Sequence, residues 1–390
     1  MDDEQYDGFG EEDELDGQEP EKPKKLHILR STLAMLTTIA LAAAGLLAFI
    51  YRDYLSEEGL RSIFRGDPAA PAGEPFTYEN GSSQTFALAG DGLAVASGSG
   101  IQLLNEGGVE VFSQVTSMEN PAVSASRQLS LFYDLGGSTC VAAGFDGEGK
   151  TLDAGKSIIS ASVNASGYFT VISEESGSRG LVHVYGSDCR ELYRWYAGTG
   201  WPIKAEVSPD NRRLAVLCVT GEGSAIVFFR LDSVDEQARL TCPGKLLFDL
   251  RFMGSDRVCA IGEDMALFAG ADGAEVSRYD FAGQYLTAYD FGSGFAALLI
   301  SPYRTGEGTL VTLDADGKVL GSAEPEGEII ALSAAERKLL AVTAGGMSLY
   351  SQALELQDSM ETLITAKAAL LRPRGDVLLL SSYFAQLYSF

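Results

Sequence analysis

The stretch Val207-Ser208-Pro209-Asp210-Asn211-Arg212-Arg213-Leu214-Ala215-Val216 decides the fold of this protein. Pro209 presets φ for a tight turn, and Asn211 tolerates the left-handed conformation that closes it. Leu214 then opens an apolar run that is predicted to form an innermost strand. The stretch is therefore a hairpin, and related turns lie within residues 163–168 and 372–377.

This hairpin recurs along residues 74–390. An apolar strand, a turn and a second, strongly apolar strand start near residues 85, 122, 158, 203, 247, 286, 328 and 365. A second hairpin follows in several repeats, with Asp-Gly turns such as Asp272-Gly273 and Asp316-Gly317. A spacing of about 40 residues is typical of four-stranded propeller blades. The prediction is an all-β β-propeller with eight four-stranded blades, or seven if one repeat is overcounted.

The last repeat is short. Its segments 366–372, 376–381 and 385–389 supply only three strands before the chain ends at Phe390. An unpaired strand edge is an aggregation hazard. We therefore expect Pro75–Glu79, which precedes the first repeat, to provide the missing strand and to close the ring.

The N-terminal region has a different composition. Residues 1–30 are predicted to be a disordered acidic tail with a basic flank at Lys22, Lys24, Lys25 and Arg30. Residues 31–51 carry no charge, and as a helix they would span roughly 30 Å of hydrocarbon, which predicts a transmembrane helix. Residues 52–73 are interpreted as a helical stalk and a Pro/Gly linker.

Two alternatives remain for residues 31–51. They could be a buried core helix, or part of a signal peptide that is cleaved. If the segment is an anchor, the slight excess of basic residues before it favours a cytoplasmic N-terminus. The expected location is then the cell membrane, with a single span and an extracytoplasmic propeller.

The repeats also carry a family resemblance. Ser208-Pro209-Asp210-Asn211-Arg212-Arg213-Leu214-Ala215 resembles the repeat of WD40-like propellers of TolB type. Residues 309–320 and 182–195 resemble quinoprotein repeats, although of the blade-end tryptophans typical of those repeats only Trp195 is present. The whole plan is similar to an uncharacterised bacterial family of single-pass, membrane-anchored β-propeller proteins.

Composition and scattered polar residues exclude several function classes. The net charge of −25 argues against a nucleic-acid partner, because phosphate binding needs a basic surface. The two histidines and five cysteines form no metal-binding or disulfide pattern, so neither a metal nor a cofactor is expected. His183 alternates with valines in a strand and is interpreted as structural. Whether Cys189 and Cys242 pair is left open.

One concentration of aromatic residues points to a binding rim. Tyr193, Trp195, Tyr196 and Trp201 follow one another at the boundary between two blades. The candidate binding residues, predicted to share one rim of the propeller, are Tyr196, Trp201, Arg179, Tyr303 and Arg304. The alternative is that Tyr193 and Trp195 pack between blades.

The sequence thus favours a non-enzymatic binding or scaffolding module at the cell envelope, with an unknown protein or cell-wall partner. A quinoprotein-like enzyme or cofactor binder is one alternative. A component of transmembrane signalling or envelope assembly that acts through the acidic tail is another.

Overall fold

The computed structural model describes residues 75–79, 81, 83–361 and 366–390. The predicted acidic tail (1–30), transmembrane helix (31–51) and stalk and linker (52–73) lie outside these residues. In the described part of the chain, no helix has the length and hydropathy needed to cross a bilayer.

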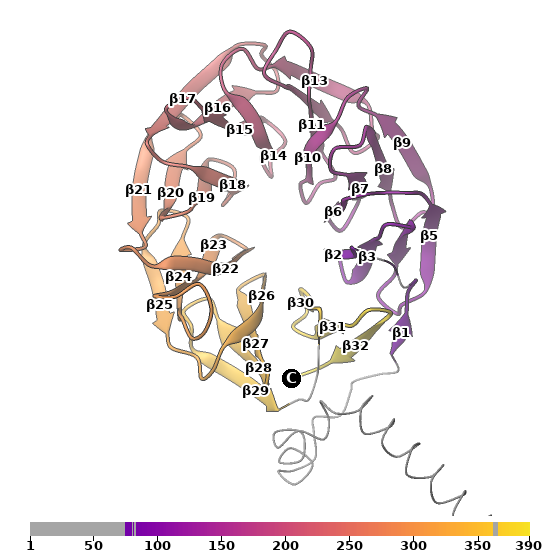
Figure 1. The fold of residues 1–390 in the computed structure, drawn as a ribbon, viewed down its shortest axis with the longest axis vertical. Helices are drawn as coiled ribbons and strands as arrows, with labels where there is room; N and C mark the ends of the chain where they lie inside the picture. The colour runs from indigo at the N-terminus through magenta and orange to yellow at the C-terminus, as the bar shows by residue number, and fades with distance from the viewer. Residues whose placement is uncertain (1–74, 80, 82, 362–365) are drawn as a thin grey trace, which may run out of the picture. The chain divides into compact units, whose positions relative to one another are not determined.

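The described residues form eight four-stranded antiparallel sheets, arranged as blades around an axis (Figure 1). The four strands of each blade are called A to D, from the axis outwards. This architecture confirms the all-β propeller with eight blades and excludes the seven-bladed alternative.

Blades 1 to 4 follow the chain order. Blade 1 consists of β2 (Thr85–Ala89), β3 (Gly92–Ala96), β4 (Gly100–Leu104) and β5 (Glu110–Val115). Blade 2 consists of β6 (Pro121–Ala125), β7 (Ser130–Asp134), β8 (Thr139–Ala143) and β9 (Gly149–Asp153). Blade 3 consists of β10 (Ile158–Val163), β11 (Phe169–Ser173), β12 (Leu181–Tyr185) and β13 (Glu191–Tyr196). Blade 4 consists of β14 (Trp201–Val207), β15 (Arg213–Thr220), β16 (Gly223–Arg230) and β17 (Glu236–Pro243).

Blades 5 to 8 continue the order until the last strand. Blade 5 consists of β18 (Leu247–Phe252), β19 (Arg257–Gly262), β20 (Met265–Gly270) and β21 (Glu275–Asp280). Blade 6 consists of β22 (Tyr285–Gly292), β23 (Phe295–Ser301), β24 (Thr309–Asp314) and β25 (Val319–Ala323). Blade 7 consists of β26 (Ile329–Ala335), β27 (Lys338–Thr343), β28 (Gly346–Ser351) and β29 (Leu356–Glu361). Blade 8 consists of β30 (Ala368–Leu371), β31 (Val377–Leu380), β32 (Phe384–Tyr388) and β1 (Phe76–Thr77).

The turn that decided the fold has the predicted chemistry. Asn211 adopts a φ of 57°, and its N–H donates to the Ser208 carbonyl at 2.9 Å. The Ser208 hydroxyl oxygen accepts the N–H of Arg213 at 3.0 Å. One detail of the prediction was wrong: Leu214 lies in β15, the second strand from the axis, and β14 is innermost (Figure 1). The turn leads from strand A to strand B because each blade begins at the axis.

The core lies between the blades. Successive residues of a strand face opposite sides of its sheet, and both sides of the B and C strands are covered by neighbouring blades. In β15, Leu217 packs toward blade 5, whereas Leu214 and Val216 pack toward blade 3. Burial on both sides explains the continuous apolar run 214–219, and each buried Leu or Val side chain contributes about 1.5–3 kcal/mol.

The ring closes as predicted, by an N-terminal strand. Strand β1 pairs with β32 in the register Phe76↔Ala385 and Thr77↔Phe384. The Tyr78 hydroxyl lies 2.7 Å from the Ser381 carbonyl oxygen, to which it donates. The first and last parts of the described chain therefore share one blade.

A buried arginine spans the same seam. Arg372, in the turn between β30 and β31, has no exposed surface and donates from Nη2 to the Glu106 carbonyl of blade 1 at 3.1 Å. Its Nη1 lies 3.4 Å from Asp376 Oδ2. Burial lowers the pKa of the Arg372 guanidinium. Backbone pairing of β1 with β32 and the hydrogen bond from the buried Arg372 to blade 1 thus both hold the seam.

Candidate functional site

The strand order gives the ring two different faces. At one of them strand B joins strand C, and strand D leads to the A strand of the next blade; we call it the D–A face. The A strands of all blades run in the same direction along the axis, because hydrogen bonds between neighbouring A strands hold them in one register. Ser160 Oγ donates to the Ile203 carbonyl at 2.8 Å, and the Leu371 N–H donates to Ser333 Oγ at 3.0 Å. All B–C and D–A loops therefore gather on this face.

Two of the predicted rim residues meet there. Arg179 lies in the B–C loop of blade 3 and Trp201 begins β14 in blade 4. The Arg179 guanidinium carbon is 4.3 Å from the centroid of the Trp201 ring, a cation–π contact. Both are brought together because the B–C loop of one blade reaches over the start of the next.

The other predicted residues lie on the same face but elsewhere around it. Tyr303 and Arg304 occupy the B–C loop of blade 6, two blades beyond Trp201. Arg304 lies 5.2 Å from the ring of Tyr285, and Tyr303 is exposed. Tyr196, at the end of β13, is exposed, and its hydroxyl accepts a hydrogen bond from Arg194 at 3.4 Å. The five residues are thus a distributed set rather than one pocket.

Tyr193 and Trp195 follow the alternative interpretation. The rings of Trp195 and Phe229 lie 5.0 Å apart, and Tyr193 also packs on Phe229, between blades 3 and 4. In an outer strand, side chains alternate between the two sides of the sheet, so only the end of β13 contributes to the rim.

Sequence reasoning missed most of the apolar surface of the D–A face. Among the described residues, every exposed Tyr and Trp lies at this face. The exposed large apolar residues there are Val115, Leu135, Tyr196, Trp201, Leu246, Phe248, Tyr285, Tyr303, Ile330 and Tyr383. They come from loops and strand ends that are far apart in sequence. Only an alignment of the repeats strand by strand would have shown that they share one face.

A second feature missed by the sequence analysis is a group of charged side chains on the inner strands of blades 4 to 6. We call it the axial cluster; it consists of Lys204, Glu206, Asp249, Arg251, Tyr289 and Asp290. Figure 1 shows the three strands β14, β18 and β22 side by side along one part of the ring.

Ion pairs connect the axial cluster. Lys204 Nζ lies 3.3 Å from Asp249 Oδ1 and 3.8 Å from Glu206 Oε1, and Arg251 Nη1 is also 3.8 Å from Glu206 Oε1. The Tyr289 hydroxyl donates to Asp249 Oδ2 at 3.1 Å. Glu206 is 3% exposed, and its Oε1 accepts no hydrogen bond from the described residues. Desolvation raises the pKa of Glu206, although both cations oppose that shift.

The cluster interrupts a pattern that blades 2, 3, 6 and 7 follow. At one repeat position, a small or acidic side chain of strand A bonds the backbone of the next inner strand. Ser124 Oγ accepts the Val163 N–H at 3.2 Å, and Asp290 Oδ2 accepts the Ala334 N–H at 2.7 Å. The register places Glu206 and Arg251 at this position in blades 4 and 5. An alignment of the repeats would have shown these two long charged residues at a position that holds serine in three blades and Ala, Asp or Leu in the other three.

His183 and the cysteines have structural roles in the described part of the chain. His183 Nδ1 lies 2.9 Å from Glu191 Oε1, and hydrogen bonds from Arg194 and His183 lower the pKa of that carboxyl group. All five cysteines are buried and free. Cys189 packs between blades 2 and 3 and Cys242 between blades 4 and 5, so the two do not form a disulfide.

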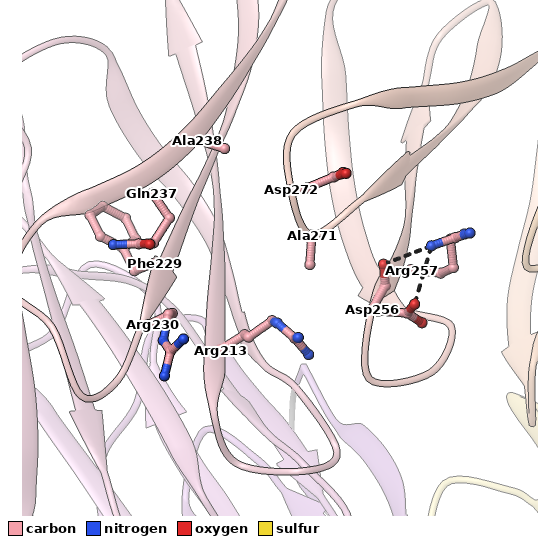
Figure 2. Close-up of a pocket in the computed structure, with 9 residues that line it drawn as sticks. All are labelled: Arg213, Phe229, Arg230, Gln237, Ala238, Asp256, Arg257, Ala271 and Asp272. Carbon is pink, nitrogen blue, oxygen red and sulfur yellow. Dashed lines mark hydrogen bonds and ion pairs between the residues drawn. The ribbon is translucent and has the colours of Figure 1, made fainter.

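A pocket of about 430 Å³ opens between blades 4 and 5 at the opposite face (Figure 2). Arg213, Arg230 and Arg257 line it, together with Asp256 and further residues. These arginines are already engaged. Arg213 donates to the Ser255 carbonyl at 2.8 Å, Arg230 binds Asp232 and Arg257 binds Asp316. The pocket is therefore an inter-blade gap whose cations serve the fold.

The described candidate residues offer two kinds of contact. The D–A face offers aromatic and apolar contacts, and the axial cluster offers ion pairs and hydrogen bonds. Within the described ranges, no three His, Cys, Asp or Glu side chains gather closely enough to hold a metal ion.

Comparisons with known proteins agree with the fold. A model of a family of unknown function, DUF5711, matches residues 75–357. No curated relative matches the chain. The C-terminal WD40 domain of Sif2 is 11% identical, with a TM-score of 0.58 over 83% of this chain and 99% of that one. BamB from Moraxella catarrhalis is 10% identical, with a TM-score of 0.54 over 82% and 99%. The β-propeller domain of Cps50 (Swd1) from Myceliophteria thermophila is 12% identical, with a TM-score of 0.50 over 70% and 98%.

Proposed function

The chain belongs to the DUF5711 family of unknown function, and we propose that it is a non-catalytic binding or scaffolding module that engages a protein partner through its D–A face. The observation that carries this proposal is the gathering of every exposed Tyr and Trp of the described residues on that face. Tyr, Trp and Arg dominate the binding energy of protein interfaces, and exposed apolar patches mark interaction sites.

Charge indicates what kind of partner fits. The described loops of the D–A face carry eleven acidic side chains: Glu79, Glu119, Glu174, Glu175, Glu222, Glu263, Asp264, Glu307, Glu324, Glu326 and Glu328. They carry five basic ones: Lys156, Arg179, Lys245, Arg304 and Lys367. An excess of acid around aromatic side chains favours a partner surface that is basic and apolar, and it disfavours nucleic acid.

Site-specific photocrosslinking tests this proposal. A photoreactive phenylalanine at Trp201 or Tyr285 of the full chain, in its native cells, should crosslink to the same protein. The matched control carries the group at Val234 or Leu356, which are exposed away from the D–A face. Equal crosslinking at all four positions would contradict the proposal, and products that contain glycan alone would identify a cell-wall partner instead.

We further propose that residues 31–51 anchor the propeller outside the membrane, with a cytoplasmic N-terminus. The uncharged run and its basic flank support this arrangement. All native thiols are buried, so a new exposed cysteine can be labelled selectively. Ser176→Cys should react with an impermeant maleimide on spheroplasts, whereas Gln5→Cys should react only after lysis. The reverse pattern would refute the orientation, and loss of residues 1–50 from the mature protein would indicate cleavage.

A further inference from the structure

We propose that the axial cluster is a binding site for a monocarboxylate that bears an aromatic group, with Arg251 as its anchor. This site lies on the inner strands, shares only Phe248 with the exposed apolar residues of the D–A face, and goes beyond the partner interface proposed there. It does not depend on that interface.

The N–H donors of the Arg251 guanidinium are available to a ligand. Its guanidinium donates no hydrogen bond to the described residues, and its ion pair with Glu206 is long, at 3.8 Å. Its side chain is 45% exposed although it stands among the inner strands of three blades. A guanidinium has five N–H donors in a rigid fork that matches a carboxylate. The arginines of the outer strands contrast with this: Arg194, Arg239 and Arg278 each grip a glutamate three residues earlier.

Arg251 is the most exposed of the four ion-paired side chains of the axial cluster. Glu206 is 3% exposed and Asp249 20%, whereas Lys204 is 24% exposed and Arg251 45%. The buried Glu206 carboxylate lies behind both cations and acts as their counter-ion. An incoming ligand therefore meets donors first, and those donors select an anion.

The charge balance of the axial cluster disfavours a doubly charged ligand. Glu206, Asp249 and Asp290 outnumber Lys204 and Arg251, so a phosphate dianion would be repelled by the acids close to the fork. A carboxylate carries one charge and fits one guanidinium in bidentate fashion.

Aromatic rings lie beside the Arg251 guanidinium. The Phe248 and Tyr289 rings are 5.9 Å apart, Tyr289 and Phe291 are 6.0 Å apart, and Arg251 lies 5.8 Å from the Phe291 ring. Such rings favour an aromatic substituent beside the carboxylate, in offset or edge contact. A free aromatic acid and the C-terminal residue of a peptide both have this chemistry.

Ligand-observed NMR or calorimetry on the full chain in nanodiscs tests the proposal. N-acetylphenylalanine should bind with a Kd in the millimolar range or below, and N-acetylphenylalaninamide at least about tenfold more weakly, because it lacks the charge that the fork recognises. Comparison with 3-phenylpropionate distinguishes the sources, since a site for peptide C-termini prefers the acetylated amino acid. Inorganic phosphate should not compete.

Variants place the site. Arg251→Gln should weaken N-acetylphenylalanine binding about tenfold or more. Arg251→Lys keeps the positive charge but lacks the planar guanidinium, so its affinity should lie between those of the wild type and Arg251→Gln. Arg337→Gln, at an exposed position in the turn between β26 and β27, is the matched control and should bind as the wild type does. Arg251 is solvent-exposed, and a thermal melt verifies that each variant folds. Any of four results would overturn the proposal: equal affinity for the acid and the amide, competition by phosphate, no binding up to about 20 mM, or an unchanged affinity in Arg251→Gln.

Discussion

The seam of the ring offers the sharpest test of how the fold is held together. Replacing Arg372 by Met keeps a long side chain but removes the fully buried charge, its bond to the Glu106 carbonyl at 3.1 Å and its ion pair with Asp376 at 3.4 Å. Breaking a buried ion pair generally costs about 3–5 kcal/mol. Two features reduce that cost: burial already disfavours the charge of Arg372, and Arg374 still lies 3.2 Å from Asp376. We therefore expect a loss of about 3 kcal/mol.

The assay is urea unfolding combined with hydrogen exchange. In a thermal melt, a loss of that size lowers Tm by roughly 4–5 °C in a domain this large. Amides of β1 and β32 should exchange faster than those of β15, because the seam opens first. Arg374→Met is the control: Arg374 is half exposed, and surface ion pairs contribute about 0–1 kcal/mol.

A double variant separates the ion pair from simple packing. Arg372→Met with Asp376→Leu should recover at least half of the lost stability, because apolar groups replace both buried charges. A loss below about 1 kcal/mol for Arg372→Met, or a loss no larger than that of Arg374→Met, would refute the reasoning.

Three further predictions concern stability. Tyr78→Phe should cost about 1 kcal/mol in urea unfolding, because it removes the hydroxyl that bonds the Ser381 carbonyl across the seam; an unchanged midpoint would show that this bond adds nothing. Glu206→Gln should gain stability relative to the wild type as pH rises, because desolvation raises the folded-state pKa of Glu206 above its unfolded value of about 4.3. The gain should be absent below that pH and complete above the folded-state pKa, and a difference independent of pH would count against it. Gly317→Ala should lower the free energy of unfolding by more than 2 kcal/mol, because the added Cβ would meet the Phe268 ring. Gly327 has a similar positive φ but open space around it, so Gly327→Ala should cost only about 1 kcal/mol. Equal losses would contradict the steric argument.

The repeat architecture could be predicted from the sequence because its causes are local. The Ser208–Asn211 turn, the Asp-Gly hairpins and the apolar run 214–219 each depend on a few neighbouring residues. The 40-residue spacing then gave eight blades, and the missing strand of the last repeat predicted closure by Phe76 and Thr77. The presence of Trp201 and Arg179 on one rim also followed, since the strand order of a blade assigns each loop to a face.

Only the tertiary structure decided which side chains meet. Arg179 reaches Trp201 because the B–C loop of blade 3 lies over the start of blade 4, whereas Tyr303 and Arg304 lie two blades further around the ring. The axial cluster and the Arg372 seam join residues about 40 and 266 positions apart. Turn chemistry and hydrophobic periodicity act within one hairpin. Which charged side chains find a partner is determined only when whole blades stack in one register. That is why the fold could be deduced from the sequence and the chemistry of its inner surface could not.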